Sequence, residues 1–173
     1  MGAKRWLGVG LVVFSLGTIL YIAVSMRSKT GAHLGAPAFV LPDQSGKPVH
    51  SGDFQGKPVL VHFWAAWCLP CTEELPELME IASEFSADSL RFILVSNDPN
   101  WDAAKKLLAK GKQSPSLVLL LDPEMKVAES YGTFQLPETY LLGRDGKVLM
   151  KWIGSQHWRD PAFKTGIAEL IKR

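Results

Sequence analysis

The stretch "VLVHFWAAWCLPCTEEL", residues 59–75, holds the only two cysteines of the chain, Cys68 and Cys71. The apolar run before them is rich in β-branched and aromatic residues, which is typical of a central strand buried on both faces. After them, apolar residues at a spacing of three and four predict a helix over 68–86, which Pro76 should kink. The sequence therefore places both cysteines where a buried strand passes into a helix.

The rest of the chain alternates between strand and helix patterns. The order of these patterns, with a β-hairpin turned by an Asp-Gly pair before the last helix, predicts an α/β fold. We expect a mixed β-sheet flanked by helices, with strands at 37–42, 57–65, 91–96, 116–122, 138–142 and 147–153, and with further helices at 99–110, at 124–131 and after Asp160.

Two cysteines separated by two residues suit a metal site, a structural staple or a redox couple. A structural zinc site needs about four ligands. The chain has no second cysteine pair, and its four histidines show no matching spacing. A bridge that closes so short a loop constrains the unfolded chain little, because the entropic gain grows with loop length. The sequence therefore favours a redox couple, and no metal or other cofactor is expected.

The position of the pair also predicts which sulfur reacts first. At the start of a helix, Cys68 would lie among unpaired backbone N–H groups at the positive end of the helix dipole. Such a position lowers the pKa of a thiol and makes it the attacking sulfur. Cys71, one turn further on, is then the resolving cysteine.

The N-terminal residues predict a single membrane anchor. Residues 6–26 carry no charge and are long enough to cross a bilayer core of about 30 Å. Positive charge is slightly greater before this run than after it, so we expect residues 1–5 to form a short cytoplasmic tail. A cleaved signal peptide is the alternative, although the run exceeds the usual ~7–15 apolar residues of one. Either way, the remaining chain is predicted on the periplasmic, extracytoplasmic side of the cytoplasmic membrane.

Two further regions follow the predicted anchor. Residues 27–36 are expected to form a tether, and residues 37–173 are enough for one domain with its own core. The net charge is +2 and the basic residues are scattered, so no nucleic-acid partner is expected.

Several motifs together resemble those of a known group of proteins. The cysteine stretch, with Pro76 five residues after Cys71, looks like the active-site region of thioredoxin-fold proteins. More narrowly, the chain resembles the membrane-anchored TlpA/ResA/CcmG (DsbE) group of thiol–disulfide oxidoreductases. This resemblance rests on "GAPAFVLPDQSGKPVHSGDFQGKPVLVHFWAAWC" (35–68), "TEELPEL" (72–78) and "QLPETYLLGRDGKV" (135–148). It implies a thioredoxin-like fold with extra N-terminal strands.

The resemblance implies a reductase of protein disulfides that a membrane electron donor of the DsbD/CcdA type keeps reduced. The clients of such proteins are often the haem-binding cysteine pairs of apocytochrome c, in cytochrome c maturation. A thiol reductase that serves another periplasmic assembly pathway is the alternative.

The resemblance also implies site residues beyond the cysteines. Pro137 matches the cis-proline, and the backbone of Leu136 before it would pair with an extended client segment. Glu74 matches an acidic residue three positions after the second cysteine, although a solvated helix face would equally explain it. The client-contacting residues are expected to be Trp67, Leu69, Pro70 and Leu136.

Two other classes of protein fit the sequence less well. A thiol peroxidase can share the opening "APAFVLPDQSG", but it requires Thr or Ser a few residues before a single reactive cysteine. This chain has Trp64 and Trp67 there instead. A copper-delivery protein of the Sco type would have three residues between its cysteines and a distal histidine.

His62 departs from the pattern of the group. Thioredoxins have Asp at this position, beneath the second cysteine, and TlpA-like proteins usually have Asn. Strand alternation places His62 with Leu60 and Trp64 on one face. Burial should hold the pKa of the imidazole below its ordinary value of ~6.5, leaving a neutral ring able to take a proton from Cys71. A core histidine with a hydrogen-bonded ring and no chemical role is the alternative.

Overall fold

A computed structural model of the protein describes residues 35–172. The strands are β1 (Val40–Pro42), β2 (Pro48–His50), β3 (Val59–Trp64), β4 (Arg91–Ser96), β5 (Leu117–Leu121), β6 (Glu138–Leu142) and β7 (Val148–Ile153). The helices are the 3-10 turn η1 (Ser51–Phe54) and the α-helices α2 (Leu69–Ala82), α3 (Trp101–Leu108), α4 (Lys126–Ser130) and α5 (Pro161–Leu170).

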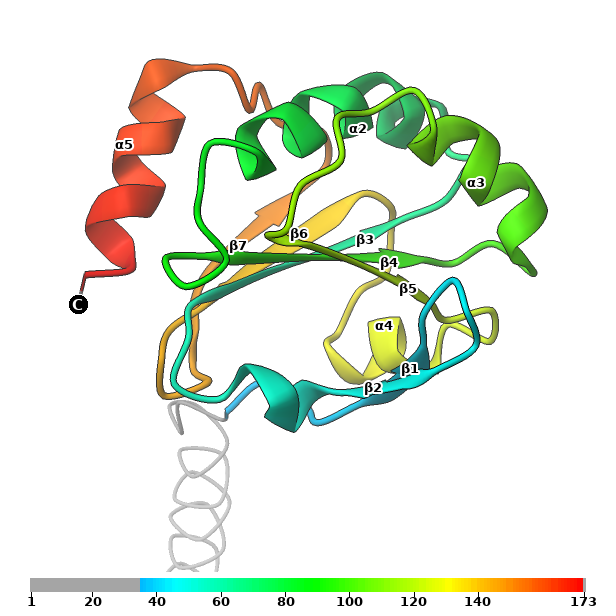
Figure 1. The fold of residues 1–173 in the computed structure, drawn as a ribbon, viewed down its shortest axis with the longest axis horizontal. Coiled ribbons are helices and arrows are strands. Elements are labelled where there is room, and N and C mark those ends of the chain that lie inside the picture. The colour runs from blue at the N-terminus through cyan, green and yellow to red at the C-terminus, as the bar shows by residue number, and fades with distance from the viewer. Residues whose placement is uncertain (1–34, 173) are drawn as a thin grey trace, which may run out of the picture. The chain divides into compact units, whose positions relative to one another are not determined.

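The main sheet is mixed and has the order β5-β4-β3-β6-β7, with β3 at its centre. Strand β3 pairs parallel with β4 and antiparallel with β6, and all six of its residues are buried. In Figure 1, α2 and α3 lie on one side of the sheet, and α4 lies on the other together with β1 and β2. The predicted α/β fold with a mixed sheet between helices is confirmed.

Each face of the sheet carries its own core. On the α2 side, Leu60 and Trp64 of β3 pack with apolar residues of α2, α3 and α5. On the opposite side, Val61 and Phe63 pack with residues of β1 and α4. The alternation expected for β3 is therefore confirmed, and it places His62 on the same side as α2.

The extra N-terminal strands form a sheet of their own. Strands β1 and β2 pair antiparallel with each other, and Asp43 makes a single bridge to Leu120 of β5. Asp43 also closes the turn between them, because its Oδ1 accepts hydrogen bonds from the backbone N–H groups of Ser45 and Lys47.

The helices are shorter than the sequence predicts. Helix α2 ends at Ala82, and the predicted residues 83–86 lie in the turn and bend that follow it. Helix α3 begins at Trp101 because the side chain of Asn100 caps it, accepting the N–H of Asp102 at 2.8 Å. The predicted start of α5 is confirmed, with Asp160 at the N-cap and Pro161 as its first residue.

The predicted cytoplasmic tail (1–5), anchor (6–26) and most of the tether (27–36) lie outside the described residues. Within residues 35–172, no helix combines the length and the apolar character needed to cross a bilayer.

Candidate active site

The two cysteines are bonded to each other at the N-terminus of α2. Cys68 is the N-cap residue, and its sulfur accepts the backbone N–H of Cys71 at 3.3 Å. Cys68 is 7% exposed, whereas Cys71 is fully buried. Pro70 lies in the first turn, where its missing N–H would have had no helical partner. The arrangement leaves Cys68 as the sulfur nearer to solvent and to the free N–H groups of the helix.

A buried carboxylate holds the turn that leads into the pair. The backbone N–H of Ala66 donates to both oxygens of Asp98, at 3.1 and 3.0 Å. The hydroxyl of Ser96 donates to the same carboxylate at 2.8 Å. Asp98 was not predicted from the sequence. It follows β4, which is parallel to β3, so the carboxyl ends of both strands lie at the same edge of the sheet.

The segment around Pro137 is linked through the end of β7 to the first turn of α2. The Leu136–Pro137 peptide bond is cis, as the resemblance implied. The carbonyl of Pro137 accepts the N–H of Gly154 at 2.9 Å, and the next residue, Ser155, donates its hydroxyl to the carbonyl of Pro70 at 3.5 Å. These bonds link the Pro137 segment, the end of β7 and the first turn of α2.

Large apolar side chains are exposed around this junction. Trp67 and Leu69 flank Cys68 and are 63% and 69% exposed, and Phe134 before the proline is 94% exposed. Ile153, opposite Glu138 in the sheet, is exposed as well. Leu136 is half-buried and Pro70 is exposed. Trp67 and Leu69 thus give Cys68 apolar, exposed neighbours, whereas Ile153 lies on the face of the sheet that carries Glu138.

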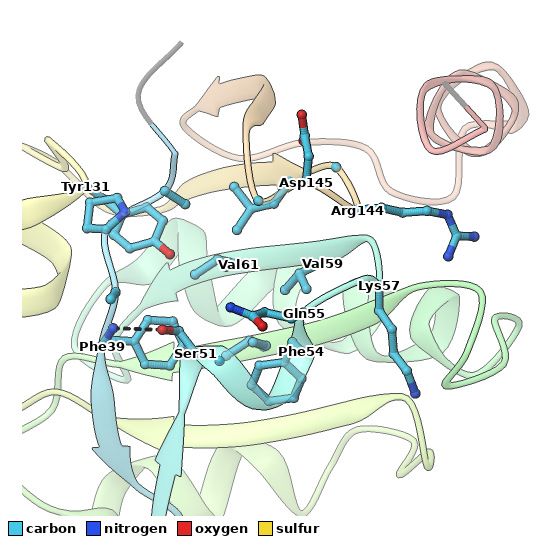
Figure 2. Close-up of a pocket in the computed structure, with 18 residues that line it drawn as sticks. Phe39, Ser51, Phe54, Gln55, Lys57, Val59, Val61, Tyr131, Arg144 and Asp145 are labelled. Carbon is cyan, nitrogen blue, oxygen red and sulfur yellow. Dashed lines mark hydrogen bonds between the residues drawn. The ribbon is translucent and has the colours of Figure 1, made fainter. Parts of the chain in front are cut away.

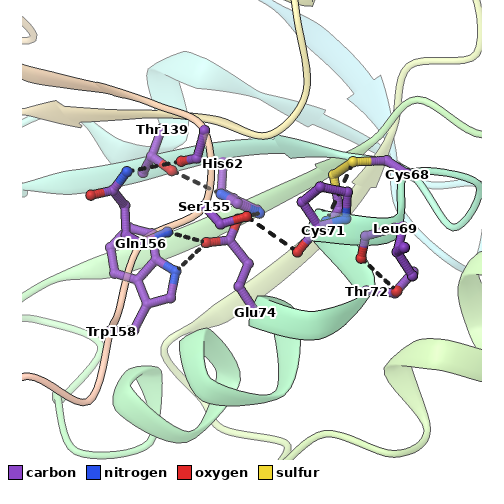
Figure 3. Close-up of polar contacts among 12 residues, drawn as sticks. His62, Cys68, Leu69, Cys71, Thr72, Glu74, Thr139, Ser155, Gln156 and Trp158 are labelled. Atoms are coloured by element: carbon purple, nitrogen blue, oxygen red, sulfur yellow. Dashed lines mark hydrogen bonds and ion pairs between the residues drawn. A yellow bond between two sulfur atoms is a disulfide. The ribbon is translucent and has the colours of Figure 1, made fainter.

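Glu74 is buried, so the interpretation of this residue as part of a solvated helix face is wrong. Its Oε2 accepts the backbone N–H of Gln156 and the indole N–H of Trp158, both at 2.8 Å. Figure 3 shows the carboxylate pointing from α2 towards these donors and towards the His62 ring. The sequence carried no signal for Trp158 or Gln156, because each lies more than 80 residues away from Glu74 along the chain.

His62 is fully buried between β6 and Glu74. Its Nδ1 lies 2.9 Å from the hydroxyl oxygen of Thr139, and its Nε2 lies 3.6 Å from Oε1 of Glu74. The ring also meets Trp158 edge to face. The structure therefore brings His62 and Glu74 together, with Thr139 as a partner that the sequence analysis missed.

Burial moves the pKa values of this pair in opposite directions. Burial lowers the pKa of His62 from 6.5 to about 3, the direction expected for a neutral ring. Burial also raises the pKa of Glu74 from 4.5 to about 7, although the hydrogen bonds from Gln156 and Trp158 oppose this rise. The carboxyl group of Glu74 consequently changes its protonation near neutral pH, next to a histidine that stays uncharged.

A second buried network lies on the other face of the sheet, immediately after Pro137. Oε2 of Glu138 accepts the hydroxyl of Tyr140 at 2.8 Å and forms an ion pair with Lys151 at 2.9 Å. Lys151 also donates to the carbonyl of Gly132 at 3.0 Å, and the hydroxyls of Thr133 and Tyr140 lie 3.0 Å apart. These contacts fix the segment before Pro137 on the face of the sheet opposite α2.

A cavity of about 450 Å³ also lies on that face (Figure 2). Phe39, Val61 and Tyr131 line it, with Lys57 and Arg144 among its polar residues. Neither cysteine contributes to its lining. Among residues 35–172, no group of three or more His, Cys, Asp or Glu side chains is placed to hold a metal ion.

Comparisons with known proteins agree with this geometry. The sequence profile of the AhpC/TSA family matches residues 34–151. The thiol-disulfide oxidoreductase ResA of Bacillus thuringiensis (strain Al Hakam) is 33% identical over 122 residues, which cover 70% of this chain and 69% of the relative. ResA of Bacillus subtilis (strain 168) is 29% identical over 141 residues, which cover 80% of this chain and 77% of the relative.

The fold is also similar to solved structures. The thioredoxin domain of a thiol-disulfide oxidoreductase from Bacteroides vulgatus matches with a TM-score of 0.67 and 28% identity. The match covers 83% of this chain and 99% of that domain.

The stability of the oxidised protein should depend on pH through Glu74. The pKa of Glu74 is higher in the folded state than in the unfolded state. Between about pH 4.5 and 7 its carboxyl group is therefore protonated in the folded protein and ionised in the unfolded chain. As the pH rises from 5 to 8, we expect the free energy of unfolding of the wild type to fall by roughly 2–3 kcal/mol more than that of Glu74→Gln. Urea denaturation of both proteins at the two pH values measures this difference. If wild type and Glu74→Gln differ in free energy of unfolding by the same amount at both pH values, the raised pKa of Glu74 is contradicted.

The reduced cysteines should differ in their reactivity. Alkylation of the reduced protein at mildly acidic pH is expected to label Cys68 well before Cys71, because Cys68 lies at the helix N-terminus and nearer to solvent. Peptide mass spectrometry after short exposure to iodoacetamide gives the order. Preferential labelling of Cys71 would reverse the roles assigned to the two sulfurs.

Proposed function

The chain belongs to the AhpC/TSA family of thioredoxin-fold proteins and is a thiol–disulfide oxidoreductase. We propose that it reduces disulfides in client proteins. The observation that carries this proposal is the bonded pair at the start of α2, with Cys68 as the N-cap residue and Cys71 buried behind it. A helix N-terminus stabilises the thiolate that thiol–disulfide exchange requires.

The reaction proceeds through a mixed disulfide. The thiolate of reduced Cys68 attacks one sulfur of the client disulfide, forms a bond to it and releases the other sulfur as a thiolate. Cys71 then loses its proton and attacks the Cys68 sulfur, which releases the second client thiolate and forms the Cys68–Cys71 disulfide. Two electrons pass from the protein to the client in each cycle.

Glu74 and His62 are the groups that accept the proton that Cys71 releases. Glu74 follows Cys71 by three residues, so both side chains lie on one side of α2, and both are buried. Its pKa of about 7 suits a group that accepts and returns a proton near neutral pH. The uncharged ring of His62 lies next to it and is a second acceptor.

The client is expected to bind as an extended segment. The exposed apolar side chains of Trp67 and Leu69 flank Cys68, and Pro70 and Leu136 would extend this binding surface. We assign these four residues to client binding, with the backbone of Leu136 pairing with the client as one strand pairs with another. Pro137, next to Leu136, would position this segment against the cysteines.

The cellular setting follows from the sequence. We propose that residues 6–26 anchor the protein in the cytoplasmic membrane, with the thioredoxin-like domain on the periplasmic side. There a membrane electron donor of the DsbD/CcdA type would keep the pair reduced, and oxidised apocytochrome c would be a client in cytochrome c maturation.

A single-turnover assay tests this function. The pre-reduced full-length chain is mixed with one equivalent of a peptide that carries a disulfide within a Cys-x-x-Cys-His segment, and the free peptide thiols are measured. We expect reduction by the wild type, none by Cys68→Ser, and a stable mixed disulfide with Cys71→Ser. A matched peptide with Ala in place of the His shows whether the haem-binding pattern matters. Rapid consumption of hydrogen peroxide without peptide reduction would overturn the proposal in favour of a thiol peroxidase.

Replacing His62 should slow the second step of the reaction. We expect His62→Asn to reduce the rate of mixed-disulfide resolution at pH 7 by on the order of tenfold, because one acceptor for the Cys71 proton is lost. Stopped-flow measurement of this step from pH 5 to pH 9 gives the profile. His50→Asn, the same change at an exposed histidine, serves as the control. Superimposable profiles for His62→Asn and the wild type would leave His62 with a packing role alone.

A further inference from the structure

Two buried polar atoms face each other without a hydrogen-bond partner. They are Nε2 of His62 and Oε1 of Glu74, which lie 3.6 Å apart. This separation is just beyond hydrogen-bond reach, so a small side-chain rotation closes it. Two buried acceptors, or two buried donors, would be costly at such a position. One proton must therefore lie between these two atoms.

The other polar atom of each side chain already has a hydrogen-bond partner. Oε2 of Glu74 accepts two N–H groups, from Gln156 and Trp158, so Oε1 is the oxygen available for protonation. Nδ1 of His62 lies 2.9 Å from the hydroxyl of Thr139, which is itself buried. A hydroxyl can turn to donate or to accept, whereas an imidazole nitrogen does only one of these in each tautomer.

Two arrangements satisfy all of these atoms. When Glu74 is ionised, Nε2–H of His62 donates to Oε1, and the Thr139 hydroxyl donates to Nδ1. When Glu74 is protonated, Oε1–H donates to Nε2, and Nδ1–H donates to the Thr139 oxygen. The ring is uncharged in both arrangements.

We propose that Thr139, His62 and Glu74 form a relay in which protonation of Glu74 switches the tautomer of His62 and turns the Thr139 hydroxyl. Thr139 is then a positioning residue that acts through His62 and Glu74, and no buried imidazolium forms when Glu74 takes the proton from Cys71. The proposal deepens the proposed function, because it rests on Glu74 as the acceptor of that proton.

The charges around His62 are few. Helix α2 presents Glu74, and Glu77 one turn further raises the pKa of Glu74, while Glu77 is itself 3.7 Å from the guanidinium of Arg159. Strand β4 places apolar Leu94 beside His62. Strand β6 gives Thr139, and the loop after β7 gives the indole of Trp158. In the oxidised protein Cys71 does not titrate, so Glu74 is the group whose charge changes beside the ring.

The tautomer of His62 can be read directly. The full-length oxidised chain is labelled with ¹⁵N in the histidine rings, and His62 is assigned by the loss of its signals in His62→Asn. We expect the Nδ1–H tautomer at pH 5 and the Nε2–H tautomer at pH 8.5, with a midpoint near the pKa of Glu74, about 7. Glu74→Gln, which cannot titrate at this position, should hold one tautomer over the whole range.

Variants of Thr139 test its part in the relay. Thr139→Val removes the acceptor for Nδ1–H, and buried N–H groups without a partner are tolerated least. The Nε2–H tautomer should then persist to a pH lower by about half to one unit. Thr139→Ser keeps the hydroxyl and should keep the wild-type midpoint.

A single tautomer in the wild type from pH 5 to pH 8.5 would overturn the relay, and an unchanged midpoint in Thr139→Val would remove Thr139 from it. Because the signal needs no client, these outcomes are separate from those of the reduction assay. A protein that reduces the peptide without switching its tautomer would retain the proposed function and lose the relay.

Discussion

Complete burial of β3 is the constraint on which the site depends. A strand covered on both faces cannot leave a polar side chain to water, so His62 must find its partners inside the protein. Thr139 on β6 and Glu74 on α2 are those partners. Glu74 then needs donors of its own, which the segment between β7 and α5 supplies through Gln156 and Trp158. One buried histidine thus ties together a strand, a helix and a loop that are distant in the chain.

The local part of the site could be predicted from the sequence, and the distant part could not. The buried strand, the helix start and the cysteine pair lie within one short stretch, where periodicity and spacing carry the information. The burial of Glu74 depends on Trp158, which follows it by 84 residues, and no local pattern connects the two. For the same reason Asp98 went unnoticed, because its role depends on the parallel pairing of β3 with β4.

The sheet separates two kinds of polar network. On the α2 side lie the cysteines and the Glu74–His62 pair, where protons and electrons are handled in the proposed reaction. On the other side, Glu138, Tyr140 and Lys151 support the segment that ends at Pro137. Successive residues of β6 serve the two networks, since Glu138 and Thr139 point to opposite faces. A change in the register of β6 would therefore exchange their surroundings and disturb both networks together.

The large sequence separation between Glu74 and its donors also affects the order in which the site forms during synthesis. Ribosomes make the chain from its N-terminus, so both cysteines and α2 are synthesised well before Trp158. Until the segment with Gln156 and Trp158 folds back, Glu74 has neither of its two donors. A nascent chain can hence form its disulfide early, while the environment that controls the proton of Cys71 is completed only after Gln156 and Trp158 have been made.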